Sequence, residues 1–212
     1  MKIRRIITGE IYHVYTKSIA EYEIFNNNFE YSRMREVIEY YKIERPFVRF
    51  SRFKERNMQI EQLEADVKGL IQIICYCIMP THIHLVLKQL KDKGISVFMS
   101  NALNSYSRYF NIKHNRKGPL WETSFKKVLV ESDAQLLHLT RYIHLNPVTA
   151  YIVDKPEDWK WSSYAEYISG NKEGICKYEA VLDMKPEIYK KFVEDRISYQ
   201  RELAKIKGLF LD

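Results

Sequence analysis

Residues 70–88 read LIQIICYCIMPTHIHLVLK, an apolar run that is interrupted once, by Pro80-Thr81. The residues on both sides of the interruption are rich in β-branched and aromatic types, which predicts two strands, at 70–79 and 82–88. Because so few residues connect the strands, we expect them to pair as an antiparallel hairpin. This hairpin is the strongest structural signal in the chain, and the other elements are placed around it.

The elements on either side of the hairpin alternate between strands and helices. Residues 9–16 and 126–131 predict strands, and apolar residues at helical spacing predict helices at 31–42 and 96–114. A capping-box pattern opens a further helix at 132–146. The resulting order predicts an α+β fold, with a ferredoxin-like antiparallel sheet that carries its helices on one face.

The chain divides into a core and a C-terminal part. We expect a core domain at residues 1–153, within which 58–67 predicts a further short helix. Residues 154–212 are expected to form a C-terminal helical extension, helical from Pro186 to about Lys207.

Composition indicates an anionic partner. The 212 residues include 34 Lys and Arg against 27 Asp and Glu, a formal net charge of +7, and sixteen tyrosines that could stack on bases. Three cysteines indicate reduced thiols rather than a disulfide framework. No apolar run reaches the roughly 18 to 20 residues that cross a bilayer, and the first residues lack the apolar stretch of a signal peptide. We therefore expect a cytoplasmic protein without a membrane segment.

His82 and His84 are the first candidate site residues. They lie two apart on a predicted strand, so their side chains leave the same face, with Cα atoms about 6.6 Å apart. Ile83 between them faces the opposite way. Two imidazoles can bind one divalent ion and leave coordination positions open for substrate and water. The pair taken alone equally fits partly solvated strand residues near a turn.

The helix at 132–146 supplies a second pair of candidates. Tyr142 and Asn146 are four residues apart and therefore share one row on the flank of the apolar face. His144 lies on a different side of the helix and is not counted as a ligand. Each residue also has a purely structural interpretation, Tyr142 as a packing residue and Asn146 as the end of the helix before Pro147.

Three blocks of sequence resemble the IS200-type Y1 transposase family, and most closely its branch of REP-associated tyrosine transposase-like proteins. The blocks are YCIMPTHIHL at 76–85, GPLW at 118–121 followed by Phe125-Lys126, and RYIHLNPV at 141–148. They occur in the family's order within roughly residues 9–153. The resemblance implies that the core domain is an HUH nuclease, a metal-dependent tyrosine transposase.

The resemblance also implies a role for each matching residue. His82 and His84 would bind the metal, Mg²⁺ or Mn²⁺, Tyr142 would be the nucleophile and Asn146 the third ligand. Asn146 stands where insertion-sequence members commonly have Gln, and His144 stands where the REP-associated branch often has Glu. Thr149 stands where many relatives have Arg, so one phosphate contact is missing.

The implied reaction cuts and joins single-stranded DNA, as in transposition and recombination. The Tyr142 phenolate attacks phosphorus and leaves a 5′-phosphotyrosine intermediate and a free 3′-hydroxyl, which conserves the bond energy for rejoining. A free tyrosine has a pKa near 10, and a bound cation would favour its ionisation. No general base is evident, with His138 the only candidate.

Basic residues are expected to line the path of the DNA, since phosphate contacts supply most of the affinity. They are interleaved with aromatic residues or lie around the Gly118 turn: Arg49, Arg52, Lys54, Arg56, Lys113, Arg116, Lys117, Lys126 and Lys127. The expected partner is single-stranded DNA with a hairpin structure. The sequence is compatible with a monomer and with a homodimer in which the tyrosine of one subunit acts with the histidines of the other.

Three alternatives remain beside this hypothesis. Cys75 and Cys77 could join the two histidines in a structural zinc site, although C-x-C is not a usual zinc spacing. The chain could be a catalytically silent nucleic-acid-binding module on the same fold, which the intact set of four site residues disfavours. A replication-initiator or relaxase relative would share the histidine pair but arrange its motifs differently.

Overall fold

The computed structural model describes residues 5–44, 48–56, 69–170, 174–178 and 183–209. Four strands form one sheet in the order β2-β3-β1-β4, and every neighbouring pair is antiparallel. The strands are β1 (Ile11–Lys17), β2 (Ile71–Ile78), β3 (His82–Gln89) and β4 (Lys126–Leu129). The predicted hairpin is therefore confirmed, with β2 and β3 joined by a tight turn in which Met79 N–H donates to the His82 carbonyl at 2.8 Å.

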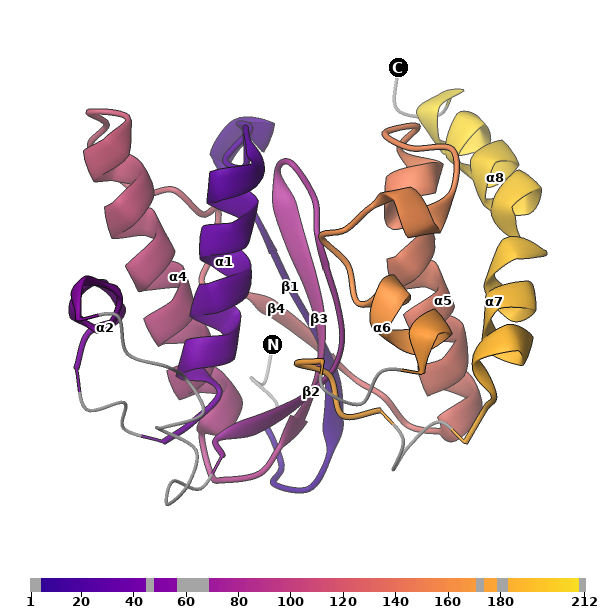
Figure 1. Cartoon of the computed structure of the whole chain (residues 1–212), viewed down its shortest axis with the longest axis horizontal. Coiled ribbons are helices and arrows are strands. Elements are labelled where there is room, and N and C mark those ends of the chain that lie inside the picture. The colour runs from indigo at the N-terminus through magenta and orange to yellow at the C-terminus, as the bar shows by residue number, and fades with distance from the viewer. Residues whose placement is uncertain (1–4, 45–47, 57–68, 171–173, 179–182, 210–212) are drawn as a thin grey trace.

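Helices cover both faces of this sheet (Figure 1). One face carries α1 (Asn28–Tyr41) and α4 (Gly94–Lys113), which pack against each other. The other carries α5 (Asp133–Thr149) and α6 (Tyr164–Ser169), whose Tyr167 hydroxyl donates to the Ile74 carbonyl of β2. The helices α7 (Pro186–Glu194) and α8 (Ile197–Leu209) pack against α5. The predicted α+β fold, with an antiparallel sheet and a C-terminal helical part, is confirmed. The expectation of helices on one face holds for α1 and α4 but not for α5, which covers the other face.

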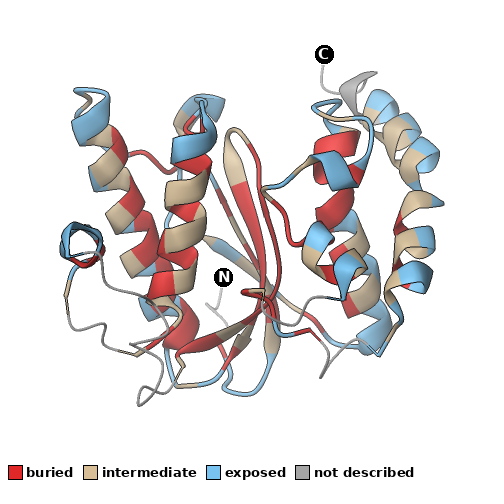
Figure 2. Cartoon of the chain, viewed as in Figure 1, coloured by how far each residue is buried: buried red, intermediate tan, exposed pale blue. Residues whose placement is uncertain are grey.

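The position of α5 follows from the sequence of the central strands. Strands β2 and β3 are buried at nearly every position, without the in-and-out alternation of a sheet that has one wet face. Both faces of the hairpin are apolar and need cover. The helices α1 and α4 cover one, and α5 with the C-terminal helices covers the other; Figure 2 shows the buried residues concentrated between these layers.

Several helix boundaries follow side-chain signals. The Asn27 side chain accepts hydrogen bonds from the Phe29 and Glu30 amides and so starts α1. The Ser132 hydroxyl accepts from the Gln135 amide at 3.2 Å, which confirms the predicted capping box of α5. Shorter helical pieces are η1 (Ile19–Glu21), α2 (Phe50–Glu55) and η2 (Pro156–Asp158).

Helix α5 and the helices after it have bounds that differ from those predicted. The expected end of α5 at Asn146 was wrong, because the helix continues through Pro147 and the Ala150 amide donates to the Asn146 carbonyl. A proline near the end of a helix removes one hydrogen bond without breaking the last turn. The helical character expected from Pro186 to about Lys207 is confirmed, although the chain turns after Glu194 and divides the segment into α7 and α8. The short helix expected at 58–67 lies outside the described residues.

The C-terminal part shares the core of the sheet domain. Tyr164, Tyr167, Tyr189 and Val193 belong to the same cluster of buried apolar residues as the strands. A buried polar contact joins the two parts as well, since His144 of α5 bonds to the Tyr189 hydroxyl at 2.8 Å. The division of the chain at residue 153 stays a prediction. Among the described helices, none has the length and apolar character needed to cross a membrane.

Candidate active site

His82 and His84 lie together on the α5 face of β3. Their ring centroids are 5.1 Å apart and the ring planes are nearly perpendicular, at 89°. Ile83 between them is fully buried toward the α1 and α4 side, as predicted. In the sheet, His84 is directly opposite Tyr15 on β1 and Cys77 on β2. The strand therefore presents two imidazoles to one region of space.

Both imidazoles are held in the neutral form. Burial lowers the pKa of His84 well below 6.5, and the neighbouring His82 and His13 lower it further. Burial also lowers the pKa of His82, while Glu21 opposes the shift and Lys17 adds to it. A neutral imidazole keeps a lone pair on one ring nitrogen, which is the form that binds a metal ion.

Tyr142 meets this histidine pair from α5. Its ring stands edge-on to the His84 ring, with centroids 6.0 Å apart and an interplanar angle of 81°. The residue is 41% exposed, so part of it can be reached from solution. Burial of the remainder raises the pKa of Tyr142 above 10.0, and Tyr15 raises it further. Across the described residues, no hydrogen bond joins the Tyr142 hydroxyl to a His, Asp or Glu side chain.

Asn146 follows one turn later on α5. It is 8% exposed, and its buried Nδ2 atom has no hydrogen-bond partner in the part of the chain that is described. Buried polar atoms are nearly always paired, so this orphan suggests an amide whose partner comes from outside the chain. If the amide is turned the other way, its oxygen takes this buried position, and the oxygen is the atom that would bind a cation.

The donor set fits a divalent cation. Two neutral imidazoles and a carboxamide supply nitrogen and oxygen ligands, a mixture that suits Mn²⁺ and, with more water, Mg²⁺. Among the described residues, no group of three or more His, Cys, Asp or Glu gathers into a metal site. The candidate set contains only two residues of those types, because its third member is an asparagine.

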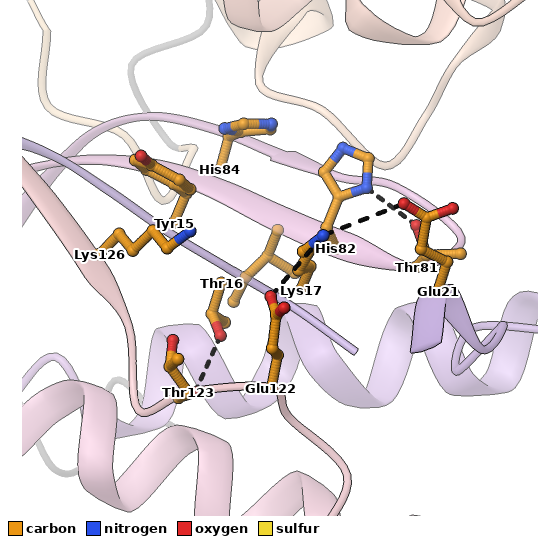
Figure 3. A pocket seen from close by; sticks show the side chains of 11 residues that line it. Tyr15, Thr16, Lys17, Glu21, Thr81, His82, His84, Glu122, Thr123 and Lys126 are labelled. Carbon is orange, nitrogen blue, oxygen red and sulfur yellow. Dashed lines mark hydrogen bonds and ion pairs between the residues drawn. The ribbon is translucent and has the colours of Figure 1, made fainter. Parts of the chain in front are cut away.

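A cavity of about 420 Å³ opens beside the histidines on the side of β1 and β4 (Figure 3). Lys17 lies in it between two acids, 3.9 Å from Glu21 and 3.7 Å from Glu122. Lys126, one of the expected DNA contacts, also lines it. The described residues that line this cavity include His82 and His84 but neither Tyr142 nor Asn146.

The other basic candidates do not share this surface. Arg49 and Lys113 line a second cavity, of about 520 Å³, between α1, α2 and α4 on the opposite side of the sheet. Lys113 is also 2.9 Å from Glu30, and Lys54 is 3.0 Å from Glu36. The remaining candidates lie on α2, at the turn after α4 or on the β4 edge: Arg52, Arg56, Arg116, Lys117 and Lys127.

The second cavity contains cations that the sequence did not single out. The guanidinium of Arg33 is stacked between two rings, 4.3 Å from the Phe50 centroid and 5.0 Å from the Tyr109 centroid. Its Nε atom is buried without a hydrogen-bond partner among the described residues. Arg108 lines the same cavity, and the described lining contains no carboxylate. An anion or a phosphodiester fits such a lining.

The zinc alternative does not fit the geometry. Cys75 and Cys77 do share the face of His84, as their strand register shows. However, Cys75 Sγ contacts His144 Nε2 at 3.3 Å, while Cys77 Sγ contacts the Met79 sulfur at 3.6 Å. Each sulfur is thus engaged by another side chain than His82 or His84, and C-x-C is not a usual zinc spacing.

Two residues beside His84, both on β1, could not be identified from the sequence. His13 Nε2 lies 3.0 Å from His84 Nδ1, and the Tyr15 ring centroid lies 5.9 Å from that of His84. Both belong to a strand that was predicted, and their odd-numbered positions place them on one face. The missing information was the pairing of β1 with β3, which brings that face against the histidines.

The fold and this site together define a class of protein in which a His-hydrophobic-His pair on a strand meets a helix tyrosine on one face of an antiparallel sheet. Residues 48–146 match the family described as transposase IS200 like. This match covers residues 48–146 alone, and it confirms the resemblance to that family that was predicted from the sequence.

Two individual proteins are similar to the chain. One is a Haemophilus influenzae protein provisionally named a REP-associated tyrosine transposase, 26% identical over 103 residues. That match covers 44% of this chain and 58% of the relative, so the chain spans less than two thirds of its length. The other is a solved structure of a REP-associated tyrosine transposase bound to a REP hairpin. It superposes with a TM-score of 0.54 at 17% identity, over 87% of this chain and 94% of that one, which shows a shared fold.

Proposed function

We propose that this protein cuts and rejoins single-stranded DNA as a transposase, with Tyr142 as the nucleophile and a divalent cation held by His82, His84 and Asn146. The observation that carries the proposal is the contact between Tyr142 and His84, 6.0 Å between ring centroids, within an IS200-like domain. A half-exposed phenol beside neutral imidazoles is the arrangement that such chemistry requires.

The chain's own residues account for the covalent step. The Tyr142 oxygen forms a bond to phosphorus as the bond from phosphorus to the 3′-oxygen breaks. The products are a 5′-phosphotyrosine and a free 3′-hydroxyl. A later attack by a 3′-hydroxyl on the phosphotyrosine restores the phosphodiester and releases the phenol. The phenol proton passes to solvent, since the tyrosine is exposed and lacks a basic partner among the described side chains.

The residues around the histidines would support this step. His82, His84 and Asn146 would hold Mg²⁺ or Mn²⁺, and the ion when bound would polarise and orient the scissile phosphate. Lys126 lies on the cavity beside the histidines, where it could contact a neighbouring phosphate. The low pKa of both histidines keeps them able to bind a cation throughout the neutral range.

Hairpin DNA is the proposed substrate. The similar solved structure has a REP hairpin bound, and the net charge of +7 favours a polyanion. The basic residues here are divided between the cavity at His82 and the cavity between α1, α2 and α4. A DNA strand that contacts both cavities would have to pass around the edge of the protein's sheet. A folded DNA can do this more readily than a short linear one.

The direct test is cleavage of an end-labelled hairpin oligonucleotide with single-stranded flanks. Cleavage in Mn²⁺ or Mg²⁺ that stops on chelation, and that is abolished in His84→Ala, supports the proposal. His138, the candidate base of the sequence, bonds to Arg141 at 2.7 Å and packs on Phe192 rather than on Tyr142, so a His138→Ala protein is the matched control and should still cleave. Tight hairpin binding without any cleavage under these conditions would instead identify a catalytically silent binding module.

A further inference from the structure

A third histidine, on the neighbouring strand, contacts His84. His13 lies on β1, and the antiparallel register places it diagonally across from His84. Its Nε2 atom lies 3.0 Å from His84 Nδ1, and the two rings are stacked at 23° with centroids 5.2 Å apart. This is a hydrogen bond between two imidazoles, supported by the stacking of their rings.

A hydrogen bond between two neutral imidazoles contains one proton, so one ring donates and the other accepts. If His84 Nδ1 donates, His84 Nε2 keeps its lone pair and can bind a cation. If His13 Nε2 donates instead, His84 carries its proton on Nε2 and cannot bind one. Histidines that bind metal ions almost always donate their other ring N–H to a neighbouring acceptor.

We propose that His13 is a positioning residue that accepts the His84 Nδ1 proton and thereby keeps His84 Nε2 unprotonated and oriented for a metal ion. The proposal rests on the metal site of the proposed function. His13 acts through His84, because its described polar contact is with that ring and it does not line the cavity beside the pair.

The other member of the pair is held in the same way. The Thr81 hydroxyl oxygen lies 3.0 Å from His82 Nδ1. Both histidines therefore have Nδ1 engaged by a neighbour within the sheet or the hairpin turn, which leaves Nε2 as the nitrogen without a protein partner among the described residues. These two contacts, one from the neighbouring strand and one from the hairpin turn, suggest that both rings are oriented for the same ligand.

The first measurement is the tautomer of His84 in the metal-free protein, by long-range ¹H–¹⁵N NMR correlation. The expected result for the wild type is a His84 ring protonated on Nδ1 alone. In His13→Leu, which removes the acceptor while keeping an apolar side chain of similar bulk, we expect the Nε2-protonated form to become populated. A wild-type His84 protonated on Nε2 would overturn the proposal.

The second measurement is Mn²⁺ binding by calorimetry. Removing such a partner typically weakens metal binding about 10- to 100-fold, and we expect that weakening in His13→Leu without a comparable fall in thermal stability. His13→Gln can still accept through its amide oxygen and should recover most of the affinity. His138→Ala is the control and should bind Mn²⁺ like the wild type. An unchanged Mn²⁺ affinity in His13→Leu would contradict a positioning role.

The two measurements separate this proposal from the proposed function. If the wild-type protein binds no Mn²⁺, the metal part of the proposed function fails. The NMR tautomer still decides whether His13 accepts from His84, because that measurement uses the metal-free protein. If Mn²⁺ binds but His13→Leu and the wild type do not differ, the metal site stands and the role of His13 is rejected.

Discussion

The Tyr142 ring stands edge-on to the His84 ring, with 6.0 Å between their centroids, although one residue lies on helix α5 and the other on strand β3. The contact exists because α5 packs on the face of the sheet that carries the histidines. Both residues belong to one chain. The geometry therefore favours an active site whose tyrosine and histidines come from the same subunit.

A mixing experiment tests this arrangement. Neither Tyr142→Phe nor His84→Ala should cleave DNA alone, and we expect an equimolar mixture of the two to stay inactive, since no subunit has a complete site. Cleavage of a labelled hairpin by the mixture is the measurement, with mixed wild-type and His84→Ala protein as the positive control. Recovery of activity in the mixture of the two variants would show that subunits exchange tyrosines.

Cleavage should accelerate with rising pH. The reactive form of Tyr142 is the phenolate, and burial, with a further contribution from Tyr15, raises the pKa of the phenol above 10.0. Only about one molecule in a thousand or fewer would be ionised at pH 7 without a cation. The single-turnover rate should therefore rise between pH 6 and 9, by up to about tenfold per pH unit. DNA affinity measured at each pH is the control, and a rate that falls from pH 7 to 9 would rule out a phenolate nucleophile.

The Glu30 carboxylate should stabilise the fold at neutral pH and lose this effect in acid. Burial alone raises the pKa of this carboxyl group, but hydrogen bonds from Lys113, the Asn26 amide and His114 outweigh it and lower the pKa from 4.5 to about 2. The side chain is fully buried, with Lys113 Nζ at 2.9 Å and His114 Nε2 at 2.7 Å. Such a shift in pKa corresponds to about 3 kcal/mol of the free energy of unfolding. This contribution is present above pH 4.5 and is lost as the pH falls toward 2.

The test is the free energy of unfolding of Glu30→Gln. We expect a decrease of roughly 2–3 kcal/mol at pH 7 from denaturant titration, which shrinks as both proteins are taken below pH 4. Glu36→Gln is the control, because Glu36 is partly exposed and pairs with Lys54 at the surface. That variant should change stability by less than about 1 kcal/mol. A Glu30→Gln effect of the same size at pH 7 and pH 2.5 would contradict the assigned cause.

The cavity between α1, α2 and α4 should contribute to DNA affinity. We expect the double variant Arg49→Ala with Arg108→Ala to bind hairpin DNA more weakly, because both side chains line a cavity with no carboxylate among its described residues. Removing one cation that neutralises a phosphate should lower the slope of log affinity against log salt by about 0.7 to 0.9. The matched control replaces Arg5 and Lys190, which pair with Asp92 and Glu157 at the surface. Equal affinities and salt slopes for the two double variants would remove this cavity from the DNA path.

Features that depend on residues close together in the sequence were predictable. The hairpin at 70–88, the face shared by His82 and His84, and the cap at Ser132 depend on neighbouring residues, and all were predicted. Prediction was weaker where distant segments meet. The contact of His13 with His84 depends on how β1 pairs with β3, which strand alternation alone does not determine.

The distribution of the basic residues was also not predictable. A surface lysine or arginine has no periodic signature, so the nine candidates could not be divided by face. The structure places Lys126 beside the histidines and Arg49 with Lys113 on the other side of the sheet. It also shows that Arg33, which the sequence pattern gave no reason to choose, lies at the centre of the second group, stacked between Phe50 and Tyr109.

The role of Tyr142 as the nucleophile is tested most directly by trapping the covalent intermediate. The wild-type protein is incubated in Mn²⁺ with hairpin DNA labelled 3′ of the cleavage site, denatured, digested and analysed by mass spectrometry. We expect one peptide that carries the nucleotide, with the phosphate on Tyr142, and no adduct in Tyr142→Phe. Tyr15→Phe, which removes the other tyrosine beside His84, should still form the adduct. An adduct that persists in Tyr142→Phe, or one that maps to another residue, would contradict the account.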